Sequence, residues 1–185
     1  MQFTSNELSD LLKKPAPLFL RDSDLSAADL NGANLEGAHL RNTNLNGAHL
    51  RNANLSSADL NWAKLEEADL REANLSNAIL SNAAMNNAVM IKADCREANF
   101  VMANLRAANL DGADLTSANL NGANLTSANL TAVNLRDANL RNADFSAVNL
   151  SGADLSEADL RGTKYNQDTI WPAGFDPKAA EAKLV

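Results

Sequence analysis

The sequence has 185 residues but only one cysteine, and aromatic residues make up 4% of it. A single cysteine excludes an internal disulfide, and so few aromatic rings mean that the core consists of many small side chains. The formal charge of −7 argues against a protein that follows nucleic-acid phosphates. No run approaches the ~18 apolar residues of a membrane span, and no basic segment followed by an apolar one opens the chain. We therefore expect a cytoplasmic protein that binds neither nucleic acid nor membrane.

The apolar residues that are present recur at a fixed spacing. From Leu25 to Leu160 an apolar residue occupies every fifth position, without insertion or deletion. Of these 28 residues, called centres below, 23 are Leu and the others are Met85, Met90, Cys95, Phe100 and Phe145. Ala stands two positions before 24 of the centres, and Asp or Asn stands directly before 22 of them. The unit is therefore Ala-(Asp/Asn)-Leu followed by two mostly polar residues.

A period of five residues fits neither regular element. Around an α-helix, successive centres would be rotated by about 140°, so they could not form one apolar stripe. In a strand, the Ala and the Leu of one unit point to the same face, but the next Leu points to the other. The chain must therefore turn once in every unit. It winds into a solenoid lined by Leu and Ala, with the other three positions facing water.

The second residue after each centre has the composition of a tight turn. Seven of the eight glycines stand there, and six asparagines share the position. Gly and Asn tolerate the positive φ that a type II turn requires. The asparagines directly before centres, such as Asn109, Asn119 and Asn129, could form a recognition ladder. We expect them instead to hydrogen-bond neighbouring backbone groups.

These units carry a family resemblance. Residues 118–127 read Ala-Asn-Leu-Asn-Gly-Ala-Asn-Leu-Thr-Ser, and such runs, over most of the chain, resemble the pentapeptide-repeat family. The resemblance implies an all-β solenoid, a right-handed quadrilateral β-helix of about seven coils, with one unit on each side of a coil. We place this β-helix at residues 20–165. An N-terminal capping helix and linker at residues 1–19 precede it, and a C-terminal capping segment at residues 166–185 follows.

The N-terminal segment is expected to cover the first coil. Thr4 and Glu7 form a capping-box pattern, so a helix is predicted to begin at Thr4 and to end before Pro15. The apolar face of this helix, which includes Leu11 and Leu12, would cover the apolar side chains and unpaired strand edges of the coil. Binding of a partner through the helix is the alternative.

After Tyr165, the last centre, large apolar residues and turn formers replace the array. Trp171 and Phe175 are expected to close the final coil, and an Asp-Pro pair at residues 176–177 predicts a short helix through Lys183. The tail is similar to the C-terminal tails of cyanobacterial pentapeptide-repeat proteins. End-to-end dimerisation through Trp171 and Phe175 is the alternative to closure.

The repeat pattern is interrupted in the middle of the array. In three successive units an apolar residue replaces the Asp or Asn before the centre: Ile79, Ala84 and Val89. With twenty residues in a coil, one face gathers four apolar residues within about three coils: Trp62, Ile79, Val101 and Met102. Val89 and Ile91 fall on the opposite face. Outward apolar clusters mark contact surfaces, so these four residues are the predicted partner patch. Repeat drift without function, or cover by a terminal segment, is the alternative.

No group of residues indicates catalysis or a bound ion. His39 and His49 are ten residues apart, on opposite sides of a twenty-residue coil, and therefore cannot share a metal ion. Cys95 is a centre and is expected to be buried in the core. An interior filled with Ala and Leu offers no concave site with convergent polar groups. We expect a protein without enzyme activity, metal or cofactor.

The sequence predicts a non-catalytic protein-interaction or scaffold module, a rigid rod that presents one surface to a protein partner. The resemblance allows a second hypothesis, a DNA mimic that binds a type II topoisomerase (gyrase), because some acidic rods of the family protect gyrase. A structural or stress-related role without a single partner is the third. A monomer, or a dimer through the C-terminal end, is compatible with each of them.

Overall fold

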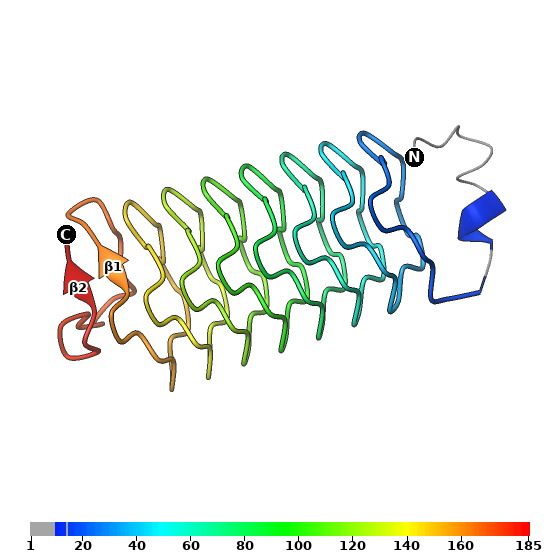
Figure 1. Ribbon diagram of the computed structural model, residues 1–185. Coiled ribbons are helices and arrows are strands. Elements are labelled where there is room, and N and C mark those ends of the chain that lie inside the picture. The colour runs from blue at the N-terminus through cyan, green and yellow to red at the C-terminus, as the bar shows by residue number, and fades with distance from the viewer. Residues whose placement is uncertain (1–9, 14) are drawn as a thin grey trace.

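The computed structural model describes residues 10–13 and 15–185, and most of them wind into a long rod (Figure 1). Residues 10–12 form a short helical turn near one end. The strands β1 (Lys164–Tyr165) and β2 (Lys183–Leu184) lie at the other end. Leu11 and Leu12 are partly buried against the core. Thr4 and Glu7, with the predicted start of the N-terminal helix, lie outside the described residues.

Parallel bridges between residues twenty positions apart join the coils. They begin with Phe19 and His39 and continue along the rod to Asp144 and Lys164. In each bridge the residue before a centre donates its N–H to the preceding coil, as Asp59 does to the Ala38 carbonyl at 2.9 Å. Its own carbonyl accepts the N–H of a centre, as from Leu40 at 2.8 Å. Twenty residues hold four units, so every coil has four sides, and the predicted solenoid is confirmed.

We name the four sides after one centre each: the Leu60, Leu65, Leu70 and Leu75 sides. A side comprises, in every coil, the residue before the centre, the centre itself and the two residues that follow it. The Leu60 side is opposite the Leu70 side, and the Leu65 side is opposite the Leu75 side.

A tight turn in every unit leaves no room for a longer strand in the coils. The centre's carbonyl accepts the N–H of the residue three positions later, as from Ala28 to Leu25 at 3.1 Å. The second residue after each centre, from Asp22 to Gly162, has a positive φ. These are the features of the type II turn that the Gly and Asn positions predict. Glu, Ser, Ala and Lys adopt the same conformation elsewhere in the array.

The interior of the rod is filled by the side chains that the period predicts. Every centre from Leu35 to Leu150 has no exposed surface. Leu18 and Leu20 are also buried and add one unit before Leu25. Cys95 is buried as predicted, and its burial raises the pKa of the thiol well above its ordinary value. The core is therefore continuous along the rod.

The predicted helix over residues 176–183 is wrong. The Asp176 carboxylate accepts the N–H groups of Lys178 and Ala179 at 2.9 and 3.3 Å, as a helix cap does, but the chain completes only one turn. Glu181, with φ 58°, ends the turn, which allows β2 to pair in parallel with β1. Pairing with a distant strand therefore overrides the local helix signal.

The aromatic residues of this end form one cluster. The ring centroid of Trp171 lies 5.1 Å from that of Phe175, 5.5 Å from that of Tyr165 and 6.2 Å from that of Phe145. Trp171 and Phe175 are partly buried against the core. Apolar packing therefore joins the backbone pairing of β1 with β2 in holding this segment on the final coil.

Candidate partner-binding surface

The Leu60 side carries a stretch without charge in the middle of the rod. On this side Asp59 is the last charged residue before the stretch and Arg141 is the first after it. The outward residues between them are all uncharged: Asn61, Trp62, Ile79, Ser81, Asn82, Asn99, Val101, Met102, Asn119, Asn121, Gly122 and Asn139. With neighbouring coils ~4.8 Å apart, the stretch measures roughly 14 Å from Trp62 to Gly122. We call it the charge-free stretch.

All four residues of the predicted patch lie in the charge-free stretch. Trp62 is 54% exposed, Met102 is 60% exposed and Ile79 is 40% exposed, whereas Val101 is half-buried. Between residues 20 and 169, a range described throughout, no other large hydrophobic side chain is exposed. The described parts of the terminal segments therefore leave the patch open to solvent.

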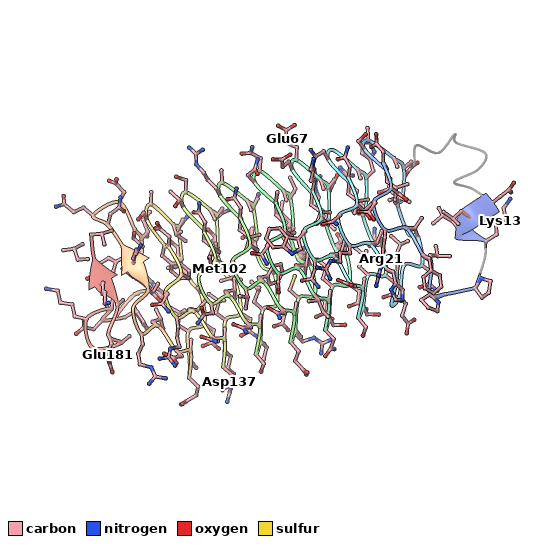
Figure 2. All side chains as sticks on the ribbon, viewed as in Figure 1. Lys13, Arg21, Glu67, Met102, Asp137 and Glu181 are labelled. Carbon is pink, nitrogen blue, oxygen red and sulfur yellow. The ribbon has the colours of Figure 1, made fainter. Side chains whose placement is uncertain are left out.

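The patch is not one contiguous apolar cluster. Trp62 and Met102 occupy the same turn position two coils apart, a separation of about 10 Å, with Asn82 between them. A methyl group placed on Gly122 would lie 2.6 Å from Met102 Sδ, so the Met102 side chain leans over Gly122 and away from Trp62. Met102 lies midway between the edges of the rod marked by Glu67 and Asp137 (Figure 2).

Trp62 and Met102 both have a backbone conformation that large side chains rarely adopt. Their φ angles are 61° and 58°. Gly has no steric cost in this region and Asn has a small one, whereas other L-residues lose about 1–2 kcal/mol. The structure therefore places its two most exposed patch residues at strained positions.

The Leu75 side, by contrast, carries most of the net negative charge. Its outward positions hold seven carboxylates and two arginines, a net charge of −5: Glu36, Asp94, Glu97, Asp114, Asp137, Asp154, Glu157, Arg96 and Arg136. The Arg96 guanidinium donates to Asp94 at 2.5 and 2.8 Å and lowers the pKa of that carboxyl. The acidic surface and the charge-free stretch thus occupy adjacent sides.

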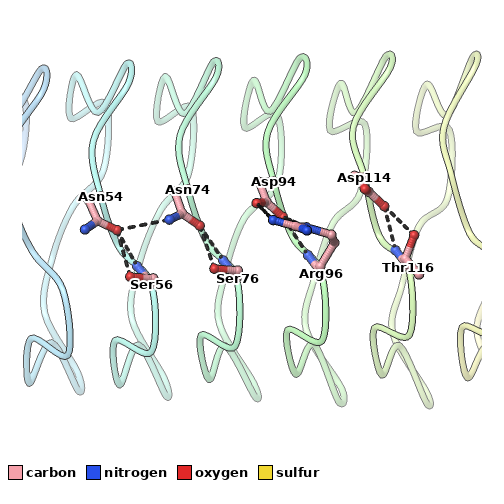
Figure 3. A network of polar contacts seen from close by, with 8 residues as sticks. All are labelled: Asn54, Ser56, Asn74, Ser76, Asp94, Arg96, Asp114 and Thr116. Atoms are coloured by element: carbon pink, nitrogen blue, oxygen red, sulfur yellow. Dashed lines mark hydrogen bonds and ion pairs between the residues drawn. The ribbon is translucent and has the colours of Figure 1, made fainter.

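The Asp and Asn residues before the centres hydrogen-bond the backbone of the turn that follows. Figure 3 shows four of them on the Leu75 side, where Asn74, for example, accepts the Ser76 N–H at 3.0 Å and the Ser76 hydroxyl at 2.7 Å. Asn109, Asn119 and Asn129 accept the N–H two residues later at 3.1 Å in each case. The predicted structural role of these asparagines is confirmed.

The two histidines have separate surroundings. His39 lies on the Leu60 side, where its ring stacks on Phe19 at 4.6 Å and its Nδ1 is 3.1 Å from the Arg21 guanidinium. His49 lies on the opposite, Leu70 side. Within residues 10–13 and 15–185, no three potential metal ligands cluster.

Sequence reasoning missed one consequence of the three apolar substitutions. Ile79, Ala84 and Val89 have no side-chain oxygen, so in the described part of the chain the turn N–H groups that follow have no hydrogen-bond acceptor: those of Ser81, Asn86 and Ile91. Asn86 is also one of the residues that line a recess on the Leu65 side, together with Asn87, Asn104, Arg106 and Ala107. The sequence signal was the loss of Asp or Asn at position 84.

Eight copies of the model for pentapeptide repeats match the chain, in overlapping segments from 19–56 to 128–164. The chain is a pentapeptide-repeat protein. This pentapeptide-repeat protein is similar to the solved structure of HetL, a pentapeptide-repeat protein involved in heterocyst differentiation regulation in the cyanobacterium Nostoc sp. strain PCC 7120. The two are 33% identical over 84% of this chain and 70% of HetL, with a TM-score of 0.62.

A second similar structure is QnrB1, a plasmid-mediated fluoroquinolone resistance protein. It is 18% identical over 92% of both chains, with a TM-score of 0.50, so this likeness shows the fold alone. No curated protein matches the chain significantly. Within the described residues of this pentapeptide-repeat protein, no helix has the length and apolar character needed to cross a bilayer.

Proposed function

We propose that this pentapeptide-repeat protein is a non-catalytic binding rod that presents its Leu60 side to a protein partner. The observation that carries the proposal is the charge-free stretch, which holds the exposed Trp62, Ile79 and Met102 on an otherwise polar rod. Protein interfaces are depleted of charged residues at their centre and enriched in Trp and Met. An uncharged surface with an exposed Trp therefore suits a partner whose own surface is uncharged and partly apolar.

The backbone conformation of Trp62 and Met102 supports the same proposal. Asn or Gly would adopt the positive φ of these positions with less strain, as Asn82 and Gly122 do beside them. A large apolar residue that leaves half of its surface in water contributes little to the core of the rod. Its presence at a strained position favours a role in binding rather than in folding.

The experiment compares three variants, each of which changes the second residue after a centre. Trp62→Asn and Met102→Asn change the charge-free stretch, whereas Lys92→Asn changes the same turn position on the opposite side, at φ 55°. The tagged proteins are incubated with extract of the native host, and the captured proteins are quantified by mass spectrometry. We expect both patch variants to lose one common partner by about tenfold or more, since a central Trp is often a hot spot. Lys92→Asn is expected to retain it. An unchanged set of partners in the patch variants would remove the patch from consideration.

A DNA mimic that binds gyrase is the second candidate, and the acidic Leu75 side favours it. A row of carboxylates creates the negative potential that attracts a basic surface, which a mimic of DNA requires. Purified protein at micromolar concentration is added to a gyrase supercoiling assay, with a variant in which Glu97, Asp137 and Glu157 are replaced by their amides. Inhibition that the variant loses would support mimicry. Undisturbed supercoiling would reject mimicry of DNA.

A rod that neither inhibits gyrase nor captures a partner would fit the third role, a structural or stress-related one.

The C-terminal end is the alternative surface for self-association. Three exposed apolar side chains gather in this region: Ile170, Leu184 and Val185. They support the proposal that the rod, if dimeric, pairs through this end. Sedimentation of wild type and Leu184→Ser across a range of concentrations distinguishes a monomer from a dimer of this kind.

A further inference from the structure

A recess of about 340 Å³ lies on the Leu65 side, which is adjacent to the Leu60 side that carries the charge-free stretch. Its lining residues come from two adjacent coils: Asn86, Asn87, Asn104, Arg106 and Ala107. In the column of residues before the centres, Ala84 stands between Lys64 and Asn104 and offers only a methyl group where a carboxamide or carboxylate is usual. The volume is at the lower end of the range for small-ligand sites.

Two of the three carboxamide oxygens in the recess, those of Asn86 and Asn104, already accept hydrogen bonds. Asn104 Oδ1 accepts the Arg106 N–H at 3.2 Å, and Asn104 Nδ2 donates to Asn86 Oδ1 at 3.4 Å. The carboxamide oxygens of Asn86 and Asn104 are therefore engaged. The backbone N–H and the Nδ2 of Asn86 have no acceptor within the described residues, because residue 84 is Ala.

The Arg106 guanidinium has no ion-pair partner in the described part of the chain. Six other arginines pair with an aspartate: Arg51, Arg71, Arg96, Arg136, Arg141 and Arg161. On the Leu65 side, the acidic residues closest to the recess along the rod are Glu66 and Glu67, one coil before Asn86 and Asn87. Glu66 is held by Asn46 Nδ2 at 2.6 Å, one coil further from the recess. Of the three arginines without a carboxylate partner in the described residues, Arg21, Arg41 and Arg106, only Arg106 lines the recess.

We propose that this recess binds a carboxylate. The guanidinium of Arg106 offers a planar pair of donors that matches a carboxylate, and the Asn86 N–H and Nδ2 add neutral donors beside it. A monoanion is favoured over a phosphate dianion because Glu67 and the acidic rod repel the second charge. The carboxylate belongs either to a small molecule or to an acidic side chain of a bound protein.

The test is a titration of the ¹⁵N-labelled protein, followed by the amide resonances of Asn86 and Asn87. Three probes are added separately: sodium acetate, a capped Gly-Glu-Gly peptide and inorganic phosphate, with sodium chloride to match ionic strength. Acetate and the peptide are expected to shift both resonances to saturation, and phosphate to bind more weakly. Tighter binding of the peptide than of acetate assigns the recess to a partner's side chain, and the reverse assigns it to a small molecule.

Three variants and one control separate the recess from general charge effects. Arg106→Gln is expected to weaken binding by about tenfold or more, since the charge-assisted bonds are the strong ones. Ala84→Asn provides the missing acceptor for the Asn86 N–H and is expected to weaken binding too, whereas Glu67→Gln is expected to strengthen it. Arg136→Gln, on the opposite side, is expected to leave binding unchanged.

All of these variants change surface positions, and their thermal unfolding midpoints show whether each is folded. The proposal is overturned if acetate and the peptide give no saturating shift, if folded Arg106→Gln binds as wild type does, or if phosphate binds more tightly than acetate. Because the recess and the charge-free stretch lie on different sides, failure here leaves the proposed partner surface untouched, and the reverse also holds.

Discussion

At the scale of single residues, the second position after each centre carries the strongest conformational constraint in the molecule. Its φ lies between 52° and 76° in every unit from Asp22 to Gly162. No Val, Ile, Thr or Pro occupies it in the entire array, because β-branched residues and proline do not fit this region. One backbone angle therefore explains the glycines and the asparagines of the turns, and Trp62 and Met102 are the only large apolar residues that adopt it between Asp22 and Gly162.

Gly122 and Gly32, which share this turn position, allow the placement of the Met102 side chain to be tested. Gly122→Ala is expected to destabilise the protein more than Gly32→Ala. Both variants force an alanine into positive φ, which costs about 1 kcal/mol. The new methyl group at position 122 would also meet Met102 Sδ at 2.6 Å, whereas that at position 32 meets nothing within 4 Å. Displacing the Met102 side chain adds roughly 0.5 kcal/mol. Urea denaturation of both variants, and of each with Met102→Ala, tests this, and an equal loss in the two would contradict the position of Met102.

The Asp159 carboxyl gives a prediction about pH. Arg161 donates to it at 2.5 and 2.8 Å and lowers its pKa from 3.8 to about 2. A group with a lowered folded-state pKa stabilises the fold above its unfolded pKa, and this contribution is lost as the pH falls from near 3.8 through about 2. We expect Arg161→Gln to raise the pKa of Asp159 toward 3.8 in a carboxyl NMR titration. Arg136→Gln serves as the control, and a pKa that is the same in Arg161→Gln and wild type would refute the ion pair.

At the scale of elements, each position of the five-residue unit has a structural role of its own. The centre and the alanine fill the core, the residue between them bonds the turn, and the turn passes the chain to the next side. Each side contributes a single bridge per coil, so the rod is held by many short parallel contacts rather than by long strands. An apolar residue before a centre removes the turn's acceptor without disturbing the core.

Restoring that acceptor is expected to stabilise the rod. Ala84→Asn should accept the Asn86 N–H, as Asn104 accepts the Arg106 N–H at 3.2 Å. One hydrogen bond of this kind contributes about 0.5–1 kcal/mol to the free energy of unfolding. Ala84→Val, which suits an extended backbone but has no oxygen, is the matched control. Urea denaturation checks the difference, and equal stability of the two variants would argue against the role assigned to this position.

The sequence predicts the repeated coil but not the C-terminal pairing or the side-chain packing between coils. The coil was predictable because the same signal repeats in every unit and each copy agrees with the next. The segment after Tyr165 occurs once, and its Asp-Pro signal describes only local capping, so the pairing of β2 with β1 could not be predicted. The lean of Met102 over Gly122 and the recess beside Arg106 depend on side-chain packing between coils, which the period alone does not encode.

At the scale of the whole molecule, the rod distributes its charge unequally around its axis. The Leu75 side has a net charge of −5, whereas the Leu60 side has no charge from Asn61 to Asn139. This division is invisible in the overall charge of −7 and becomes apparent only when the residues are sorted by a twenty-residue coil. A charge-free stretch on one side presents a defined surface to a partner over several coils.

The Leu60 side is best tested as the partner surface by site-specific photo-crosslinking in extract of the native host. A photoreactive residue replaces Asn82, between Trp62 and Met102 on the Leu60 side, or Lys92 at the same turn position on the opposite side. Both native residues have positive φ, at 60° and 55°, so the two probes start from equivalent backbone. If the Leu60 side binds the partner, we expect one dominant protein adduct from position 82, which Trp62→Asn abolishes, and none from position 92. Adducts from position 92 alone, or the same adducts from both positions, would contradict the assignment of the Leu60 side as the partner surface.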